Sequence, residues 1–165
     1  MNGAPELVWR AVVIGVGATI GMDIWAACLR RLGVPSLNLA HLGRWLAHAL
    51  RGQWRHRSIA EAPPVRGESW LGWCAHYTSG VALAGLLLFI EGDTWVQAPS
   101  LLPALVLGWV TVLAPLFVLQ PGMGAGIASS RTSRPIFNSV KSVVTHTVFG
   151  LGLYATAFAR AWLLR

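Results

Sequence analysis

The chain has 165 residues, of which 55% are hydrophobic and only 12% are charged, and its mean hydropathy is +0.56. Charged residues make up about 25% of soluble globular domains, so this composition excludes an ordinary soluble protein and indicates a membrane protein. The formal net charge of +7 then reflects membrane topology and attraction to anionic lipid headgroups, and nucleic-acid binding is a poor interpretation of it.

Four apolar runs are long enough to cross a bilayer, which takes about 20 residues in a helix. They cover residues 7–29, 70–90, 99–119 and 143–164. Barrel strands would be about half as long and would alternate in polarity. The first run lacks a preceding basic tract and is too long for a cleaved signal peptide. We therefore predict an all-α bundle of four transmembrane helices in one domain, residues 1–165.

Basic residues set the predicted orientation. The connection 30–69 carries seven arginines and the connection 120–142 carries Arg131, Arg134 and Lys141, whereas the connection 91–98 has two acids and no base. The positive-inside rule places both basic connections in the cytoplasm and both termini on the outer side. Three arginines are exceptions to this rule, because they lie on the outer side: Arg10, Arg160 and Arg165.

The first span contains one ionisable side chain in an otherwise small and apolar face. Gly15, Thr19, Asp23 and Ala27 recur at four-residue steps and so share one side of the helix. Small residues let a second membrane helix approach closely. Asp23 is therefore expected to face a partner helix rather than lipid.

A basic amphipathic helix is predicted at about residues 37–51, between the first two spans. The simplest interpretation places it in the membrane interface, with Trp45 and Trp54 at headgroup level. Its polar face and its extension offer three arginines to lipid headgroups: Arg44, Arg51 and Arg55. In the alternative, this connection folds back over the bundle and closes a site with His48, His56, Glu61 and Glu68.

The second and fourth spans each carry a histidine four residues before a glycine: His76 with Gly80, and His146 with Gly150. Counted at 1.5 Å per residue, both histidines and Asp23 come to a similar depth below the cytoplasmic surface. The shared spacing also suggests a weak internal repeat of two helical hairpins.

The third span contains Pro103 and Pro115, which predict a kink. A glycine-rich segment, 120–131, follows it. This segment is interpreted as a flexible connection, with a re-entrant turn as the alternative. It lacks the Gly-Lys-Ser/Thr ending of a phosphate-binding loop.

Several of these stretches together resemble a family of bacterial inner-membrane proteins catalogued as a domain of unknown function, number 2938. The resemblance is carried by residues 15–25, 43–45, 67–68, 72–77, 120–126 and 149–154. It implies a four-helix fold in the bacterial inner membrane, and the orientation predicted from the basic residues makes both termini periplasmic. It implies no activity and assigns no role to any residue.

The first functional hypothesis is a metal centre. One carboxylate and two imidazoles, from Asp23, His76 and His146, are a ligand set suited to zinc or non-haem iron. Additional ligands are available from His48, His56, Glu61, Glu68 and Met123. A less favoured variant is haem held between the two intramembrane histidines.

Two other hypotheses use the same three groups. Intramembrane Asp and His side chains can relay protons in a transporter, for which four helices per chain would require a homo-oligomer. Alternatively, these side chains only hold the helices together through hydrogen bonds. Whether the chain is an enzyme stays open.

Overall fold

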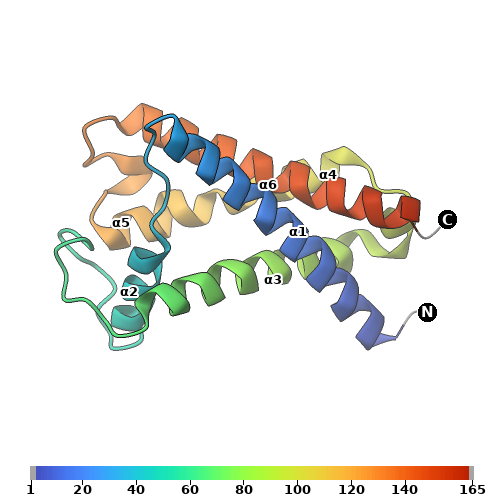
Figure 1. The fold of residues 1–165 in the computed structure, drawn as a ribbon, viewed down its shortest axis with the longest axis horizontal. Helices are drawn as coiled ribbons and strands as arrows, with labels where there is room; N and C mark the ends of the chain where they lie inside the picture. Colours follow the sequence, from blue (N-terminus) through green and yellow to red (C-terminus); the bar gives the residue numbers. More distant parts are fainter. Residues whose placement is uncertain (1–2, 164–165) are drawn as a thin grey trace.

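The computed structural model describes residues 3–163 of the chain, and the regular structure in that range is helical (Figure 1). The long helices are α1 (Ala4–Arg31), α3 (Glu68–Gln97) and α6 (Pro135–Leu163). The shorter elements are α2 (Leu39–Ala49), α4 (Leu101–Thr111), the π-helix η1 (Pro115–Leu119), α5 (Gln120–Met123) and the 3-10 turn η2 (Ile127–Ser129). The all-α prediction is confirmed.

Within the described residues, four helical segments are long and apolar enough to cross a membrane: Ala4–Arg31, Glu68–Gln97, Leu101–Met123 and Pro135–Leu163. Each predicted span is present, but the helices extend beyond the apolar runs. The largest differences are at the start of α6, which begins at Pro135 rather than at 143, and at the end of α3, which continues to Gln97; both stretches were predicted to be connections. Helical hydrogen bonding does not stop where the hydrocarbon ends, so apolar runs underestimate helix length.

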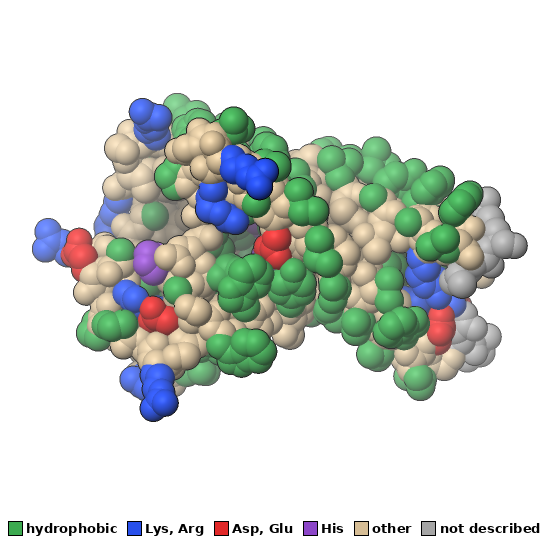
Figure 2. Space-filling view, viewed as in Figure 1, with side chains coloured by type: hydrophobic (Ala, Val, Ile, Leu, Met, Phe, Trp, Pro, Cys, Tyr) green, Lys and Arg blue, Asp and Glu red, His purple; other side chains and the backbone are tan. Residues whose placement is uncertain are grey.

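Helix α1 is the central element of the bundle. It packs along α3 on one side and along α6 on the other, while α4 packs on α6 and α2 packs on α3. Helix α3 scarcely touches α4 or α6. Figure 1 shows both termini at one end and α2 and α5 at the other. Lys and Arg side chains gather at the α2 end, and apolar side chains cover the middle (Figure 2).

Glycines make the contacts of α1 with its neighbours very close. A Cβ atom on Gly15 would lie 2.5 Å from the Cα of Val81 on α3, and one on Gly152 of α6 would lie 2.8 Å from the Cα of Ala18. Both distances are shorter than real carbon contacts allow. The small-residue faces therefore bring the backbones together, as expected for membrane helices. Ile14 and Ala18 are fully buried in this seam.

Helix α2 is a short helix packed on α3. Asn38 caps it by accepting a hydrogen bond from the Ala40 N–H at 2.9 Å, and the helix ends at Ala49, two residues before the predicted end. Trp45 was expected at headgroup level but is buried, with its indole N–H donating to the Trp54 carbonyl at 3.0 Å. Trp54 is exposed. Leu42 and Ala49 are buried, as the amphipathic pattern predicts, but Leu50 on the same side is exposed and His48, predicted on the polar side, is buried.

Candidate functional site

Asp23 of α1 accepts hydrogen bonds at both carboxylate oxygens from neighbouring residues of α3. The His76 Nε2 atom lies 3.1 Å from Oδ1, and the Tyr77 hydroxyl donates to Oδ2 at 2.7 Å. The side chains are 27% exposed for Asp23 and 16% exposed for His76. Asp23 precedes the end of α1 by eight residues, or about 12 Å at the helical rise. A carboxylate at that depth is costly unless paired.

The pair formed by Asp23 and His76 can hold a proton in two ways without moving its heavy atoms. With Asp23 ionised, the imidazole Nε2–H donates to the carboxylate; with Asp23 protonated, the carboxyl O–H donates to a bare Nε2. Adding one proton to the ionised pair cancels its net charge. Loss of charge removes the main cost of burial in an apolar medium.

His146 is not bonded to that pair. Its Nδ1 donates to the Ser142 carbonyl on the preceding turn of α6 at 3.0 Å, which leaves Nε2 as the proton-accepting atom. Within residues 3–163, no group of three or more His, Cys, Asp or Glu side chains is arranged to hold a metal ion. The structure thus brings Asp23 and His76 together, but it does not assemble the expected three-ligand centre.

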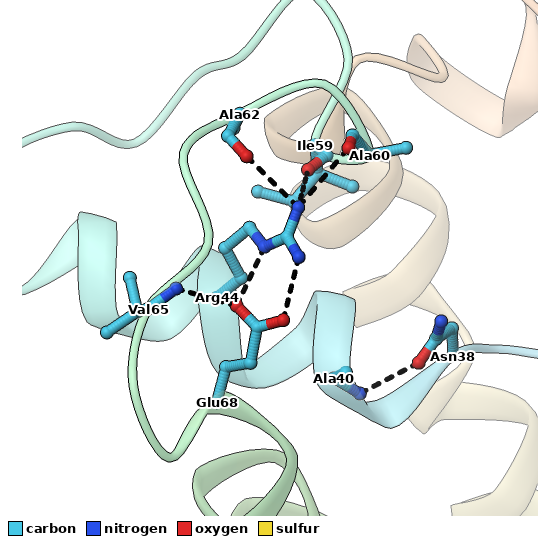
Figure 3. Close-up of polar contacts among 8 residues, drawn as sticks. All are labelled: Asn38, Ala40, Arg44, Ile59, Ala60, Ala62, Val65 and Glu68. Carbon is cyan, nitrogen blue, oxygen red and sulfur yellow. Dashed lines mark hydrogen bonds and ion pairs between the residues drawn. The ribbon is translucent and has the colours of Figure 1, made fainter.

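Arg44 and Glu68 form a second polar site, at the α2 end of the molecule. The guanidinium donates to both carboxylate oxygens, at 2.8 Å and 2.7 Å, and through Nη1 to the carbonyls of Ile59, Ala60 and Ala62 (Figure 3). Glu68 also accepts from the Val65 N–H. Hydrogen bonding to Glu68 raises the pKa of Arg44 above its ordinary value. Arg44, expected at lipid headgroups, instead fastens the 50–67 connection to α3.

His48 and His56 form a third polar pair, which joins α2 to the glycine-rich segment. His48 Nδ1 lies 2.8 Å from His56 Nε2, and His56 Nδ1 lies 3.3 Å from the Gly122 carbonyl. A carbonyl only accepts, so His56 carries its proton on Nδ1 and receives the His48 N–H at Nε2. The Met123 carbonyl accepts from the Ile59 N–H at 3.0 Å. The segment predicted to be a flexible connection is therefore tied to 50–67 by hydrogen bonds.

The other predicted site residues lie outside these three groups. Three of them are exposed on the 50–67 connection: Arg51, Arg55 and Glu61. Contact of the two arginines with lipid headgroups stays a prediction. Sequence analysis missed Tyr77, although it directly follows His76. It also missed Trp25, whose indole N–H donates to Thr145 of α6 at 3.2 Å. Aromatic residues are common in membrane helices, so nothing in the sequence marks a polar role for these two. Their hydrogen-bond partners are seen only in the fold.

A family model described as a protein of unknown function (DUF2938) matches residues 12–160. This range includes α2, all three polar groups and His146. No curated protein and no solved structure matches the chain.

Proposed function

Because the chain belongs to the DUF2938 family, whose description gives no function, we propose a function from its own residues: proton-coupled transport of a small solute. Asp23, His76 and Tyr77 form the proton-binding centre. The protein is placed in a bacterial inner membrane with both termini periplasmic, and it acts as a homo-oligomer because four spans are few to enclose a solute path. Lys and Arg at the α2 end support this orientation.

The observation that carries the proposal is the pairing of both Asp23 oxygens with donors on another helix. Because the donors come from α3, proton occupancy of Asp23 changes the attraction between α1 and α3. A proton that alters contacts between two helices can be linked to their movement. Intramembrane carboxylates and histidines of this kind are typical of proton relays.

A second support is the interrupted third span. Helix α4 ends at Thr111, the π-helix η1 follows, and Gly124 ends α5 in a left-handed conformation with φ +98°. Ala128 and Ser129 also have positive φ, at 48° and 59°. Interrupted helices and strained backbone occur where membrane proteins bind solutes and ions.

Polar side chains line this interruption on the side of α6. Gln120 donates to the Ser142 hydroxyl at 3.2 Å and accepts from the Ser129 hydroxyl at 3.0 Å. The backbone carbonyl of the same Ser142 accepts the hydrogen bond from His146 Nδ1. The amide of Gln120 and the hydroxyls of Ser129 and Ser142 together suit a small, hydrogen-bonding solute. Gln120 is partly exposed, so its bonds can be exchanged for bonds to a ligand.

Transport is tested with purified protein in proteoliposomes adsorbed on a solid-supported membrane, under an imposed pH gradient. The panel contains amino acids, sugars, organic acids, ammonium, Zn²⁺ and Fe²⁺. We expect a transient current for at least one solute class, its loss in Asp23→Asn and its persistence in Glu61→Gln, a change at an exposed acid. A current that persists in Asp23→Asn would contradict the proposal.

Proton binding is tested separately, without any solute. Infrared difference spectra of the purified protein across a pH titration should contain a carboxylic acid band that Asp23→Asn removes and Glu61→Gln retains. If Asp23→Asn changes only thermal stability and leaves the spectra and currents intact, the polar side chains act as helix-packing contacts alone.

A further inference from the structure

The end of the bundle that carries the termini is held by a network of four charged side chains. Arg10 of α1 donates to Glu6 at 2.8 Å and to Asp93 of α3 at 2.6 Å, and Arg160 of α6 donates to Glu6 at 3.0 Å. The Arg10 side chain is only 10% exposed, whereas that of Asp93 is 54% exposed. Three helices are thus connected through two basic and two acidic groups.

The contacts of this network are of two kinds. Glu6 and Arg10 lie one turn apart on α1, and Arg160 joins them from α6, so the two contacts to Glu6 stay within the closely packed pair of α1 and α6. The contact between Arg10 and Asp93 is different, because it crosses to α3. Since α3 scarcely touches α4 and α6, moving its end away from α1 would break this ion pair and leave the others intact.

A local break in α3 positions Asp93 for this contact. Gly92 has φ +72° and ψ −170°, so the regular helix stops there and the last turn is set off from the rest. Positive φ is readily adopted by glycine and strained for other residues. A shallow cavity of about 240 Å³ lies beside the break, lined by Arg10, Asp93 and apolar side chains. The last turn of α3 therefore follows a backbone break and has free space next to it.

Between this network and Asp23, the seam of α1 with its neighbours is closed. Arg10 and Asp23 are thirteen residues apart on α1, or about 20 Å at the helical rise. Ile14, Ala18 and Ala84 are fully buried in that interval, and the Thr19 hydroxyl contacts the backbone where Gly80 has no side chain. The polar groups at Asp23 and at Arg10 thus lie on opposite sides of a dry layer.

We infer that the Arg10–Asp93 ion pair is the outer gate of the transport path, closed in this conformation, with Gly92 as its joint. This inference rests on the proposed transport function, because a gate has a use only where a path exists. Glu6 and Arg160 hold the Arg10 guanidinium in place on the α1 and α6 side. Once separated, both Arg10 and Asp93 can be hydrated from the outer surface. Partly exposed ion pairs are weak for that reason, which suits a contact that must open repeatedly.

The test measures access to a buried position near the gate. In a background with both native cysteines replaced by serine, Leu88→Cys places a thiol at a site that is 2% exposed. Its reaction rate with a membrane-impermeant maleimide is followed from the outer side of spheroplasts. We expect slow labelling in this background and labelling about fivefold faster in Asp93→Asn, the population change for one weak ion pair.

Asp93→Asn is chosen because the half-exposed side chain of Asp93 tolerates the change. In the same test, Arg10→Gln should accelerate labelling at least as much. Arg134→Gln, a change at an exposed arginine at the opposite end, is the matched control and should leave the rate unchanged. Unchanged labelling in well-folded Asp93→Asn and Arg10→Gln would overturn the gate. Accelerated labelling supports it. The result is independent of the current measurements, which alone decide whether any solute is transported.

Discussion

Asp23 and Trp25 lie two residues apart on α1, and their side chains bond to helices on opposite sides of it. Asp23 binds His76 and Tyr77 of α3, and Trp25 binds Thr145 of α6. One short segment of α1 therefore joins two parts of the bundle that have few contacts of their own. Loss of the Asp23 bonds would loosen the connection of α1 to α3 and leave its connection to α6 intact.

Removing the Tyr77 hydroxyl tests the first connection. Tyr77→Phe keeps the ring but deletes the 2.7 Å hydrogen bond to Asp23, and we expect a loss of about 1 kcal/mol of stability. The measurement is unfolding of the purified protein in detergent. Tyr154→Phe, in α6, is the control for loss of a phenol elsewhere. Equal stability of Tyr77→Phe and the wild type would mean that the bond contributes nothing.

The seam between α1 and α3 gives a matched pair of glycine substitutions on one helix. Gly15→Ala introduces a methyl group 2.5 Å from the Val81 Cα, and overpacking of this kind costs about 1–3 kcal/mol. Gly21→Ala meets nothing within 4 Å and should be neutral or stabilise the helix by up to about 1 kcal/mol. Thermal unfolding of both variants should separate them clearly. Equal effects would show that the seam adjusts to an added methyl group.

Arg44 should be required to hold the 50–67 connection in place. Arg44→Ala removes all of its contacts at once, and Arg44→Lys should not restore them, because an ammonium cannot reach two carboxylate oxygens and three carbonyls in the same geometry. Since the pKa of Arg44 is raised, its charge persists throughout the pH range of the experiment. Limited proteolysis should cut 50–67 faster in both variants.

Arg51→Ala is the control for Arg44, because Arg51 is exposed on the same connection. It should be cut at the wild-type rate. If Arg44→Lys behaves like the wild type, positive charge alone holds the connection and the planar fork of the guanidinium is not needed.

The histidine pair gives a fourth prediction. His56→Phe preserves a ring against His48 but removes the bonds to His48 and to the Gly122 carbonyl. We expect faster hydrogen exchange at the amides of His56 and Ile59, which bond to the carbonyls of Gly122 and Met123. His41→Phe, at the other end of α2, should leave both amides protected. Unchanged exchange in His56→Phe would indicate that backbone bonds alone hold the two segments.

The sequence predicted the spans well because a helix in hydrocarbon needs a long apolar run, and such runs are directly visible. The direction of Asp23 toward another helix also followed from the four-residue spacing of small residues around it. The partners of these side chains were less predictable. The carboxylate of Glu68 and the guanidinium of Arg44 are 24 positions apart, and their contact depends on how the 50–67 connection folds back.

His146 shows a different limit of sequence analysis. Its depth matched that of Asp23 and His76, so a shared site was a reasonable hypothesis. The rotation of α6 and the Ser142 carbonyl one turn away decided the outcome, since the imidazole Nδ1 binds that carbonyl. Depth along a helix can be counted from a sequence, but the direction of a side chain relative to distant helices cannot.

The π-helix Pro115–Leu119 has a consequence for how this span tolerates insertions and deletions. A π turn holds one residue more than an α turn, so deleting a single residue there would let the segment wind as a regular helix with its hydrogen bonds complete. Because the surplus residue is absorbed within a single turn, the residues beyond it would keep nearly the same direction. Gln120 would still face Ser142, so the span can lose one residue at this place without turning its polar end away.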